Sequence, residues 1–347
     1  MKVAIIGIDS LYWPLVFTPT LNDDPDIDVI GYTDLGVDSE AVAANLGMTA
    51  DEFGAEFDLP ALADAETAYS DADAAVIMTR NSRMPGLITQ ALHADCHAFA
   101  AKPVGVDVAE LNAIGEALDA TTPRFGAGWS SFGYQPSRAL RSVLADDPIG
   151  DLHTLRVMHN HGRIRDWGAG TWYTDPAEGN TCHYLGWYPV HFATAVFGPV
   201  TEIAGHAQVM PGWGADAAGD WETPTQCKAF GTHDNGRIST IEVYADIGDD
   251  WDVAPIEAEI VGTDGVVRYA ASGGSVAIHQ DGGVEEVQMD AVDDDANDHD
   301  LEAWLDACRG DGDPLLGGRD VLHVAAVGCA WDRSVREDRP VSVAITP

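Results

Sequence analysis

The first residues able to do chemistry form a turn after a short apolar run, residues 2–6. Gly7 ends this run, at the point where a dinucleotide-binding fold lets backbone N–H groups approach a pyrophosphate. The fingerprint needs two further glycines, but Asp9 and Tyr12 stand at their positions. Because a carboxylate repels a pyrophosphate, Asp9 must turn away if this turn binds a dinucleotide. The sequence leaves two interpretations open: a retained dinucleotide site, or a Rossmann-like domain that has stopped binding dinucleotide.

Two more charged residues follow predicted strands. Asp34 ends the segment 28–34, where a carboxylate can accept a hydrogen bond from a ribose hydroxyl and would repel a 2′-phosphate, which favours NAD over NADP. Lys102 follows the short strand at 97–100 and precedes Pro103, so it faces the crevice beyond the carboxyl edge of a parallel sheet. An ammonium there can hydrogen-bond a substrate hydroxyl and stabilise the alkoxide that forms as hydride leaves. The alternative is a structural ion pair.

The elements that must position these residues alternate in the first part of the chain. Short apolar segments predict strands, at residues 2–6, 28–34, 74–79 and 97–100. Helical segments lie between and after them, for example at residues 85–94 and 108–118. Strands separated by helices predict βαβ units and a parallel sheet. We therefore expect an α/β Rossmann domain over residues 1–121.

The pattern changes after about residue 121. Segments joined by tight turns predict further strands, at residues 152–158, 203–210, 227–231, 237–244, 256–261, 266–269 and 341–345. The turn sequences at 234–236 (DNG) and 263–265 (TDG) are strong hairpin signals. Two helices are expected near the C-terminus, at residues 299–309 and 319–333. These features predict an α+β domain with an open, mainly antiparallel sheet over residues 122–347, and its outer face predicts a homodimer or homotetramer.

Composition excludes several classes of partner. The chain has 347 residues, with 57 acidic and 18 basic side chains, for a net charge of −39. A nucleic-acid backbone needs a basic surface, and a membrane-spanning helix needs about 18 consecutive apolar residues, which the sequence lacks. The N-terminus shows no secretory signal, and the five cysteines form no CxxC motif. We expect a cytoplasmic protein with reduced thiols and a small-molecule substrate.

The acidic excess is accompanied by depletion of lysine. Only Lys2, Lys102 and Lys228 occur, beside fifteen arginines. This composition resembles that of proteins from organisms that keep molar salt in the cytoplasm, where the screening length falls to about 3 Å and carboxylates repel one another weakly. The sequence favours a halophilic protein; the alternative is an ordinary acidic one.

Four segments carry a resemblance to a known family. Residues 73–81 (DAAVIMTRN) are similar to the family motif DaVvIaTPN, and residues 96–104 (CHAFAAKPV) to GKHVLcEKPl. Residues 172–189 (WYTDPAEGNTCHYLGWYP) are similar to DP…GG…DiGcYP, and residues 261–265 (VGTDG) contain the GTkG hairpin. In this order the segments resemble the glucose-fructose oxidoreductase, inositol dehydrogenase and MocA-like family of NAD(P)-dependent oxidoreductases. The match covers almost the full length.

The resemblance implies hydride transfer to or from a sugar, polyol or related hydroxy compound. It implies Lys102 as a catalytic residue and Tyr188 as a second, because the family carries His or Tyr there. A phenol near Lys102 can act as general acid or base, and the alternative for Tyr188 is aromatic packing. The family's acids fall on Tyr184 and His191, close to His183. On helical spacing Tyr184, Tyr188 and His191 share a face, so His191 or His183 can assist as a proton relay.

The resemblance also implies a set of cofactor contacts, namely Gly7, Ile8, Asp9, Ser10, Asp34, Thr79, Asn81, Lys102 and Pro103. Several positions depart from the family pattern. Ala101 replaces a glutamate, and Met84 stands where a substrate-contacting histidine is frequent. Trp129, Phe132 and Tyr134 replace an arginine-rich segment and suit either an aromatic floor or a core. The departures at Asp9, Tyr12, Ala101, Met84 and Tyr184 give weight to a rival function, a ligand-binding or scaffold protein that kept the fold and lost turnover.

A metal site is a further alternative. His159 and His161 are spaced to put both imidazoles on one face of a strand, and zinc sites use such pairs. No acid at ligand spacing completes a set with His183 and His191, and the antiparallel second half does not fit a metal-dependent hydrolase barrel. We therefore expect no metal, with NAD or NADP as the cofactor.

Overall fold

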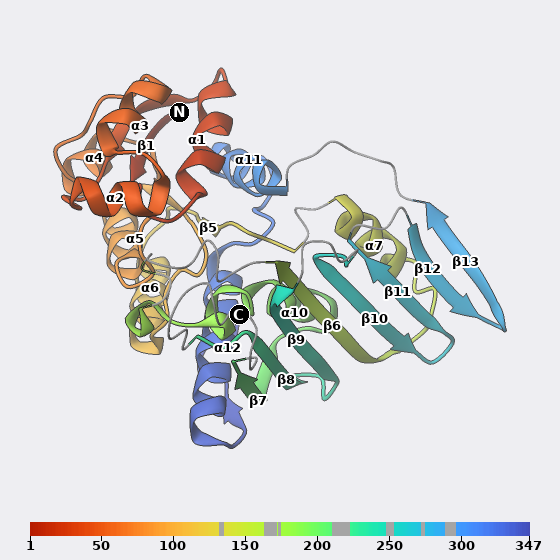
Figure 1. Ribbon diagram of the computed structural model, residues 1–347. Coiled ribbons are helices and arrows are strands. Elements are labelled where there is room, and N and C mark those ends of the chain that lie inside the picture. Colours follow the sequence, from red (N-terminus) through yellow and green to blue (C-terminus); the bar gives the residue numbers. More distant parts are fainter. Residues whose placement is uncertain are drawn as a thin grey trace. The chain divides into compact units, whose positions relative to one another are not determined.

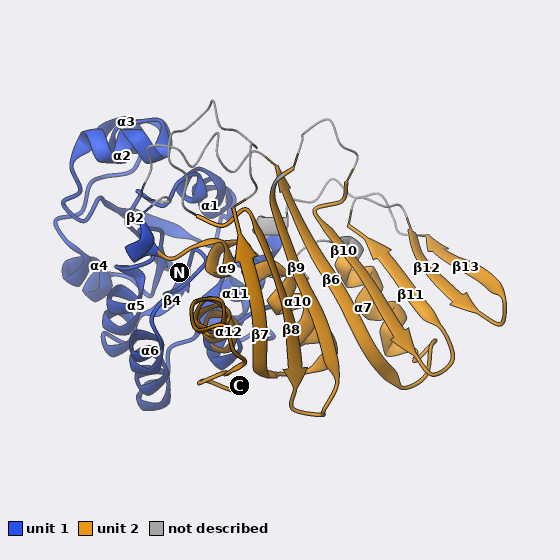
Figure 2. Ribbon diagram, turned by 60° about the horizontal axis from the view of Figure 1, so that its bottom comes forward, with its two compact units in different colours: residues 1–129, 170–178, 297–322 blue, residues 130–169, 179–296, 323–347 orange. Residues whose placement is uncertain are grey.

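The computed structural model describes residues 1–131, 135–162, 172, 175–209, 223–247, 253–271, 275–288 and 296–347. The chain forms two compact units, coloured separately in Figure 2. The first unit consists of residues 1–129, 170–178 and 297–322. The second consists of residues 130–169, 179–296 and 323–347. Each unit thus contains segments that are far apart in the sequence.

In the described part of the first unit, five parallel strands form one sheet in the order β2-β1-β3-β4-β5. The strands are β1 (Lys2–Ile6), β2 (Asp28–Thr33), β3 (Ala74–Ile77), β4 (His97–Ala100) and β5 (Phe125–Ala127). β3 is buried along its whole length, as expected for a parallel strand covered on both faces. Ile6 pairs with Thr33 on one side and with Ile77 on the other. The segments that follow β1, β2 and β3 therefore leave the sheet at the same edge, and the predicted Rossmann-like sheet is confirmed.

Helices connect these strands (Figure 1). They are α1 (Trp13–Asp23), α2 (Ser39–Leu46), α3 (Ala50–Phe57), α4 (Ala65–Asp71), α5 (Met84–His93) and α6 (Val108–Ala120). A further helix, α11 (Ala296–Arg309), comes much later in the chain and belongs to the same unit from residue 297 onward. Most begin at side-chain caps: the carboxylate of Asp107, for example, accepts from the amides of Ala109 and Glu110 at the start of α6. α1 differs, since its N-cap is Tyr12, which makes no side-chain cap, and Pro14 lies in its first turn. The helix after the candidate dinucleotide turn thus begins without a competing side-chain acceptor.

The second unit contains a sheet whose described strands follow the order β13-β12-β11-β10-β6-β9-β8-β7-β14. The strands are β6 (Leu152–Gly162), β7 (Val200–Gln208), β8 (Gln226–His233), β9 (Ile238–Ile247), β10 (Ile256–Gly262), β11 (Val266–Ala270), β12 (Ser275–Gln280), β13 (Gly283–Gln288) and β14 (Val341–Ser342). Neighbours pair antiparallel except β6 and β9, which are parallel. A parallel pair needs a crossover, and the chain between β6 and β9 contains helices and two further strands. The predicted open, mainly antiparallel sheet is confirmed.

Helices of the second unit cover one face of this sheet (Figure 2). α10 (Trp187–Phe197) packs on β6 and β9, and α7 (Gln135–Ala145) on β12. The short α9 (Thr181–Tyr184) precedes α10, and α12 (Gly318–Glu337) contributes its residues from 323 onward. β8 alternates accordingly: Cys227 and Ala229 are buried, whereas Lys228 and Phe230 point to the opposite face and are exposed.

Some features singled out in the sequence lie outside the described residues. These are Phe132, Tyr134 and residues 173–174. None of the helices in the described ranges combines the length and the apolar composition that crossing a bilayer requires.

Candidate functional site

The turn after β1 packs closely against the end of β3. Gly7 has φ +80°, and its amide donates to the carbonyl of Thr33 at 2.8 Å. A Cβ added at Gly7 would lie 2.7 Å from the Cβ of Thr79 and 3.1 Å from the carbonyl oxygen of Met78. Both the positive φ and the lack of space therefore require glycine at this position. A tight glycine turn at the carboxyl edge of a parallel sheet is the cradle that a dinucleotide pyrophosphate needs.

Asp9, at the second fingerprint position, points away from solvent and toward the end of β3. Its side chain is fully buried, and the hydroxyl of Thr79 donates to its Oδ1 at 2.6 Å. Arg80 Nε lies 3.4 Å from Asp9 Oδ2, an ion pair longer than a hydrogen bond. Burial raises the pKa of the Asp9 carboxyl, against the lowering effects of Thr79 and Arg80. The indole N–H of Trp172 donates to the Asp9 carbonyl at 2.7 Å, which fixes the backbone of the turn as well.

The other residues expected to contact the cofactor, in the turn and after β2, differ in solvent exposure. Ile8 and Ser10 are buried within the turn. Asp34 is partly exposed at the end of β2, and its Oδ1 accepts from the amide of Gly36 at 2.9 Å. That bond fixes the direction of the carboxylate at the edge where the turn after β1 also lies. The donor and acceptor set of this edge therefore fits a dinucleotide, with Asp34 placed for a ribose hydroxyl.

Asn81 is held by a residue that sequence reasoning missed. Its Nδ2 donates to the carbonyl of Glu178 at 2.7 Å, while its Oδ1 is buried and accepts no hydrogen bond from the residues that the structure describes. The Glu178 carboxylate accepts from both the amide and the hydroxyl of Ser82, at 2.9 and 2.7 Å. Glu178 follows Asp175 and Pro176 in the sequence, which mark a turn but not its destination.

Lys102 lies beyond β4 in the first unit, and its side chain is almost fully buried. Its Nζ is 5.8 Å from the centroid of the Trp13 ring, within the range of a cation–π contact. Burial lowers the pKa of Lys102 to about 7, and the peptide bond to Pro103 is cis. An amine that titrates near neutrality can both accept and donate a proton there, as a general acid–base group must.

In the second unit, Tyr188 and His191 lie on the first turns of α10 and share one neighbour. The amide of Ser131 donates to His191 Nδ1 at 2.9 Å, and its hydroxyl donates to the Tyr188 carbonyl at 2.7 Å. Burial lowers the pKa of His191 to about 4, with a further lowering effect from Arg141. Because Nδ1 accepts a hydrogen bond, we assign the proton of the neutral ring to Nε2. The ring centroids of His159 and Tyr188 are 4.3 Å apart, so the phenol also packs against an imidazole.

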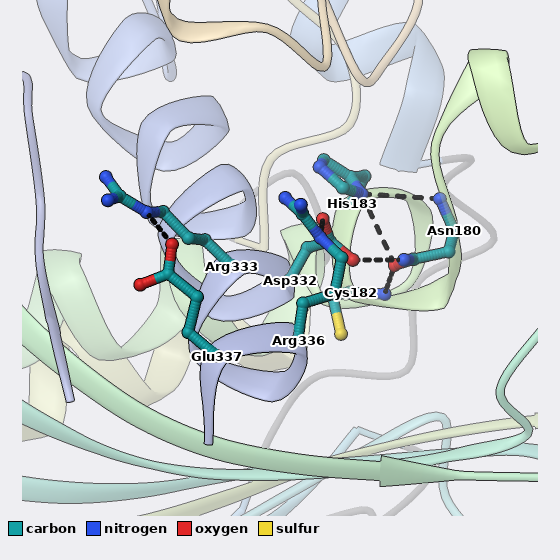
Figure 3. A network of polar contacts seen from close by, with 7 residues as sticks. All are labelled: Asn180, Cys182, His183, Asp332, Arg333, Arg336 and Glu337. Carbon is teal, nitrogen blue, oxygen red and sulfur yellow. Dashed lines mark hydrogen bonds and ion pairs between the residues drawn. The ribbon is translucent and has the colours of Figure 1, made fainter. Parts of the chain in front are cut away.

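His183 belongs to a polar network around the start of α9 (Figure 3). The amide of Asn180 donates to His183 Nδ1 at 3.3 Å, completing a capping box. Asn180 Nδ2 donates to Asp332 Oδ1 at 2.6 Å, and Asp332 Oδ2 pairs with Arg336 Nε at 2.9 Å. Burial lowers the pKa of His183 to about 4, although Asp332 acts in the opposite direction. The observed hydrogen bonds thus use His183 to cap and anchor α9.

The structure corrects the expectation of one continuous helix carrying Tyr184, Tyr188 and His191. α9 ends at Tyr184, and α10 begins only at Trp187. The amides of Leu185 and Gly186 both donate to the carbonyl of Thr181, so the turn is wider than an α-helical one. The helical spacing that would align Tyr184 with the other two residues is therefore interrupted.

Among the described residues, the histidines considered for a metal site do not form a ligand set. The rings of His159 and His161 are 5.9 Å apart. Across the ranges that the structure describes, no group of three or more His, Cys, Asp or Glu side chains could hold a metal ion. The expectation that the protein needs no metal stays a prediction.

Both halves of the chain match known protein families. Residues 1–128 match an oxidoreductase family with an NAD-binding Rossmann fold, and residues 137–268 match the GFO/IDH/MocA C-terminal domain. The chain belongs to the GFO/IDH/MocA oxidoreductase family. The two matches follow one another as the four motif segments of the sequence predict, so the resemblance is confirmed.

Relatives of this GFO/IDH/MocA protein include the trans-1,2-dihydrobenzene-1,2-diol dehydrogenase of Bos taurus, 32% identical over 169 residues. That match covers 46% of this chain and 47% of the relative, so the chain matches about half the length of this curated relative. An oxidoreductase of Agrobacterium radiobacter, solved with NAD+, L-tartaric acid and magnesium, superposes with TM-score 0.80 at 18% identity, covering 99% of this chain and 98% of that one. An NAD-binding oxidoreductase of Klebsiella pneumoniae gives 0.78 at 16% identity, covering 99% of both chains. At these identities the two structures show the fold alone.

Proposed function

We propose that the protein is an NAD(P)-dependent oxidoreductase that transfers hydride to or from a sugar, polyol or related hydroxy compound. The orientation of Asp9 carries this proposal. The one side chain of the turn that would repel a pyrophosphate is instead bonded to Thr79 and paired with Arg80. Two similar proteins support the substrate class, one named for a dihydrodiol and one solved with tartaric acid, both of which are vicinal hydroxy compounds.

The chain's own residues would bind the cofactor and transfer the proton of the substrate hydroxyl. When bound, the nicotinamide accepts or delivers the hydride. Lys102, whose pKa lies about 7, takes the hydroxyl proton as the substrate is oxidised and returns it during reduction. Tyr188 is the second proton-handling group. His191, with Nδ1 engaged by Ser131, offers Nε2 to a relay, and His183 is retained as an auxiliary candidate.

The cofactor is proposed to lie against Gly7, Ile8, Asp9, Ser10, Asp34, Thr79, Asn81, Lys102 and Pro103. NAD is favoured over NADP because Asp34 would repel a 2′-phosphate. We assign dinucleotide binding to residues 1–121, and substrate binding and oligomerisation to residues 122–347. Asp34→Ser should therefore weaken NAD+ binding and reduce the ratio of NAD+ to NADP+ affinity; an unchanged ratio would contradict the role of Asp34.

The test of the function is calorimetric titration of NAD+ and NADP+, followed by a screen of polyols for cofactor reduction. We expect saturable binding, and turnover that falls at least about 100-fold in Lys102→Met and Tyr188→Phe while NAD+ affinity changes little in Tyr188→Phe. The absence of binding at millimolar cofactor would instead favour a ligand-binding or scaffold protein. The replacement of two fingerprint glycines by Asp9 and Tyr12 is the observation behind that second candidate.

The setting of the protein is also a proposal. The charge of −39 and the scarcity of lysine support a halophilic cytoplasmic protein, and a fully folded circular dichroism spectrum in dilute buffer would contradict this. On the face of the second sheet opposite Cys227 and Ala229, Phe230 is 63% and Ile238 is 52% exposed in the described part of the chain, which supports a homodimer or homotetramer. Sedimentation of a strictly monomeric species at micromolar concentration would contradict the assembly.

A further inference from the structure

Arg80 is a charged residue at the dinucleotide edge to which sequence reasoning assigned no role. It follows Thr79 directly, beyond the carboxyl end of β3, and its side chain is 32% exposed. Its Nε faces Asp9 Oδ2 at 3.4 Å. Among the described residues, neither of its Nη groups has a hydrogen-bond partner. Within the described ranges, the guanidinium thus pairs with Asp9 through Nε and has both Nη groups available for a further partner.

Several contacts fix the turn and the Asp9 carboxylate that the Arg80 guanidinium faces. Gly7 brings the turn so close to Thr79 that no Cβ fits between them, and the Thr79 hydroxyl holds the Asp9 carboxylate. Asp9 in turn lies beside Arg80, and the Trp172 indole holds the Asp9 carbonyl. The fixed carboxylate restricts where the guanidinium can lie, and this lowers the conformational entropy lost when the arginine binds an anion.

When the second fingerprint position is glycine, the backbone there closely approaches the pyrophosphate of the cofactor. Here an acid occupies it, and the acid is paired with a cation. Resting on the proposed function, we propose that Arg80 binds the pyrophosphate of the dinucleotide through its Nη groups, and that Asp9 is the positioning residue that orients it. A guanidinium forms paired bonds to phosphoryl oxygens, which compensates for the backbone contacts that the lost glycines would allow.

Arg83 provides a matched control. It lies three residues further along, is exposed, and acts on Asp9 only through its charge, without an ion pair to any residue that the structure describes. A general electrostatic attraction of anions would depend on both arginines. A specific phosphate contact would depend on Arg80 alone.

The experiment is a calorimetric titration of NAD+ and of ADP-ribose, which carries the pyrophosphate but no nicotinamide. Arg80→Gln should weaken both ligands about 30-fold, since a lost charge-assisted hydrogen bond corresponds to about 10- to 100-fold and Asp9 is left uncompensated. Arg80→Lys should bind both ligands more tightly than Arg80→Gln but more weakly than the wild type, because lysine restores the charge but not the paired N–H donors of a guanidinium. Arg83→Gln should change either dissociation constant less than threefold. Thermal unfolding without ligand establishes that each variant is folded.

The pair Asp9→Asn and Asp9→Asn/Arg80→Gln tests the roles of the two residues. Asparagine keeps an oxygen for the Thr79 hydroxyl. We expect the double variant to bind more tightly than Arg80→Gln, yet about tenfold more weakly than the wild type. Wild-type affinity in the double variant would mean that Arg80 only neutralises Asp9, and would overturn the proposal. Equal losses in Arg80→Gln and Arg83→Gln, or no loss in Arg80→Gln, would overturn it while leaving the proposed function intact. A wild-type protein that binds neither NAD+ nor NADP+ would overturn both.

Discussion

The hydroxyl of Thr79 donates a 2.6 Å hydrogen bond to the carboxylate of Asp9, 70 residues away in the sequence. This bond joins the turn after β1 to the end of β3 inside the first unit. It resolves a conflict that the sequence poses, because it directs an acid at the second fingerprint position into the protein. The same bond makes the buried carboxylate sensitive to a single substitution.

Thr79→Val should destabilise the protein by about 1–3 kcal/mol at neutral pH, because a buried carboxylate loses its hydrogen bond without a large change in volume. The folded-state pKa of Asp9 is raised, so ionisation of Asp9 lowers the free energy of unfolding as the pH rises through that pKa. Valine at position 79 raises the pKa of the Asp9 carboxyl further. The loss of unfolding free energy in Thr79→Val should therefore become smaller toward pH 4. Urea unfolding at several pH values measures this.

Thr18→Val is the control for that substitution. Thr18 is also fully buried, but its hydroxyl has no hydrogen-bond partner among the described residues. Valine there should be neutral or stabilising at every pH, since no bond is lost. A Thr79→Val protein as stable as Thr18→Val would show that the bond to Asp9 contributes nothing.

Lys102→Met should stabilise the protein below neutral pH. Burial lowers the pKa of Lys102 to about 7 from 10.5, so the unfolded chain binds more protons between these values and stability rises with pH across that window. Methionine removes the cost of burying an ammonium. The free energy of unfolding should therefore rise by up to about 5 kcal/mol below pH 7, and this gain should disappear toward pH 10.5. The exposed Lys2→Met is the control and should show no such trend. A constant difference between wild type and Lys102→Met from pH 6 to 10 would contradict a buried, titrating amine.

His191→Asn should make the protein more resistant to acid. The pKa of His191 is lowered to about 4 from 6.5, so the unfolded chain takes up a proton that the folded chain excludes, and stability falls as the pH drops through this range. Asparagine retains an acceptor for the Ser131 amide and has no group that takes up this proton. The free energy of unfolding of His191→Asn should therefore exceed that of the wild type by up to about 3 kcal/mol near pH 4. The measurement is the pH dependence of the unfolding free energy, whose slope should decrease by up to one proton. His153→Asn, at an exposed position, should leave the slope unchanged.

Much of the architecture follows from the sequence by itself. Strand and helix periodicity, the hairpin turns and the four motif segments predict a parallel sheet followed by a mainly antiparallel one. Gly7 is identifiable because a turn of this kind requires a residue without a Cβ. Asp34 and Lys102 are identifiable because each follows a strand of the parallel sheet, whose carboxyl ends meet at one edge. These inferences depend on backbone conformation and on local order along the chain.

Tertiary structure alone decided where the side chains point. Asp9 turns toward Thr79 and Arg80, and Trp172 and Glu178 reach the same edge from a segment about a hundred or more residues away. The helix expected to align Tyr184 with His191 divides because two amides share the carbonyl of Thr181. Such choices depend on long-range partners, and on the free energy of burying a charge or leaving a polar group unpaired. Local periodicity contains no information about either quantity.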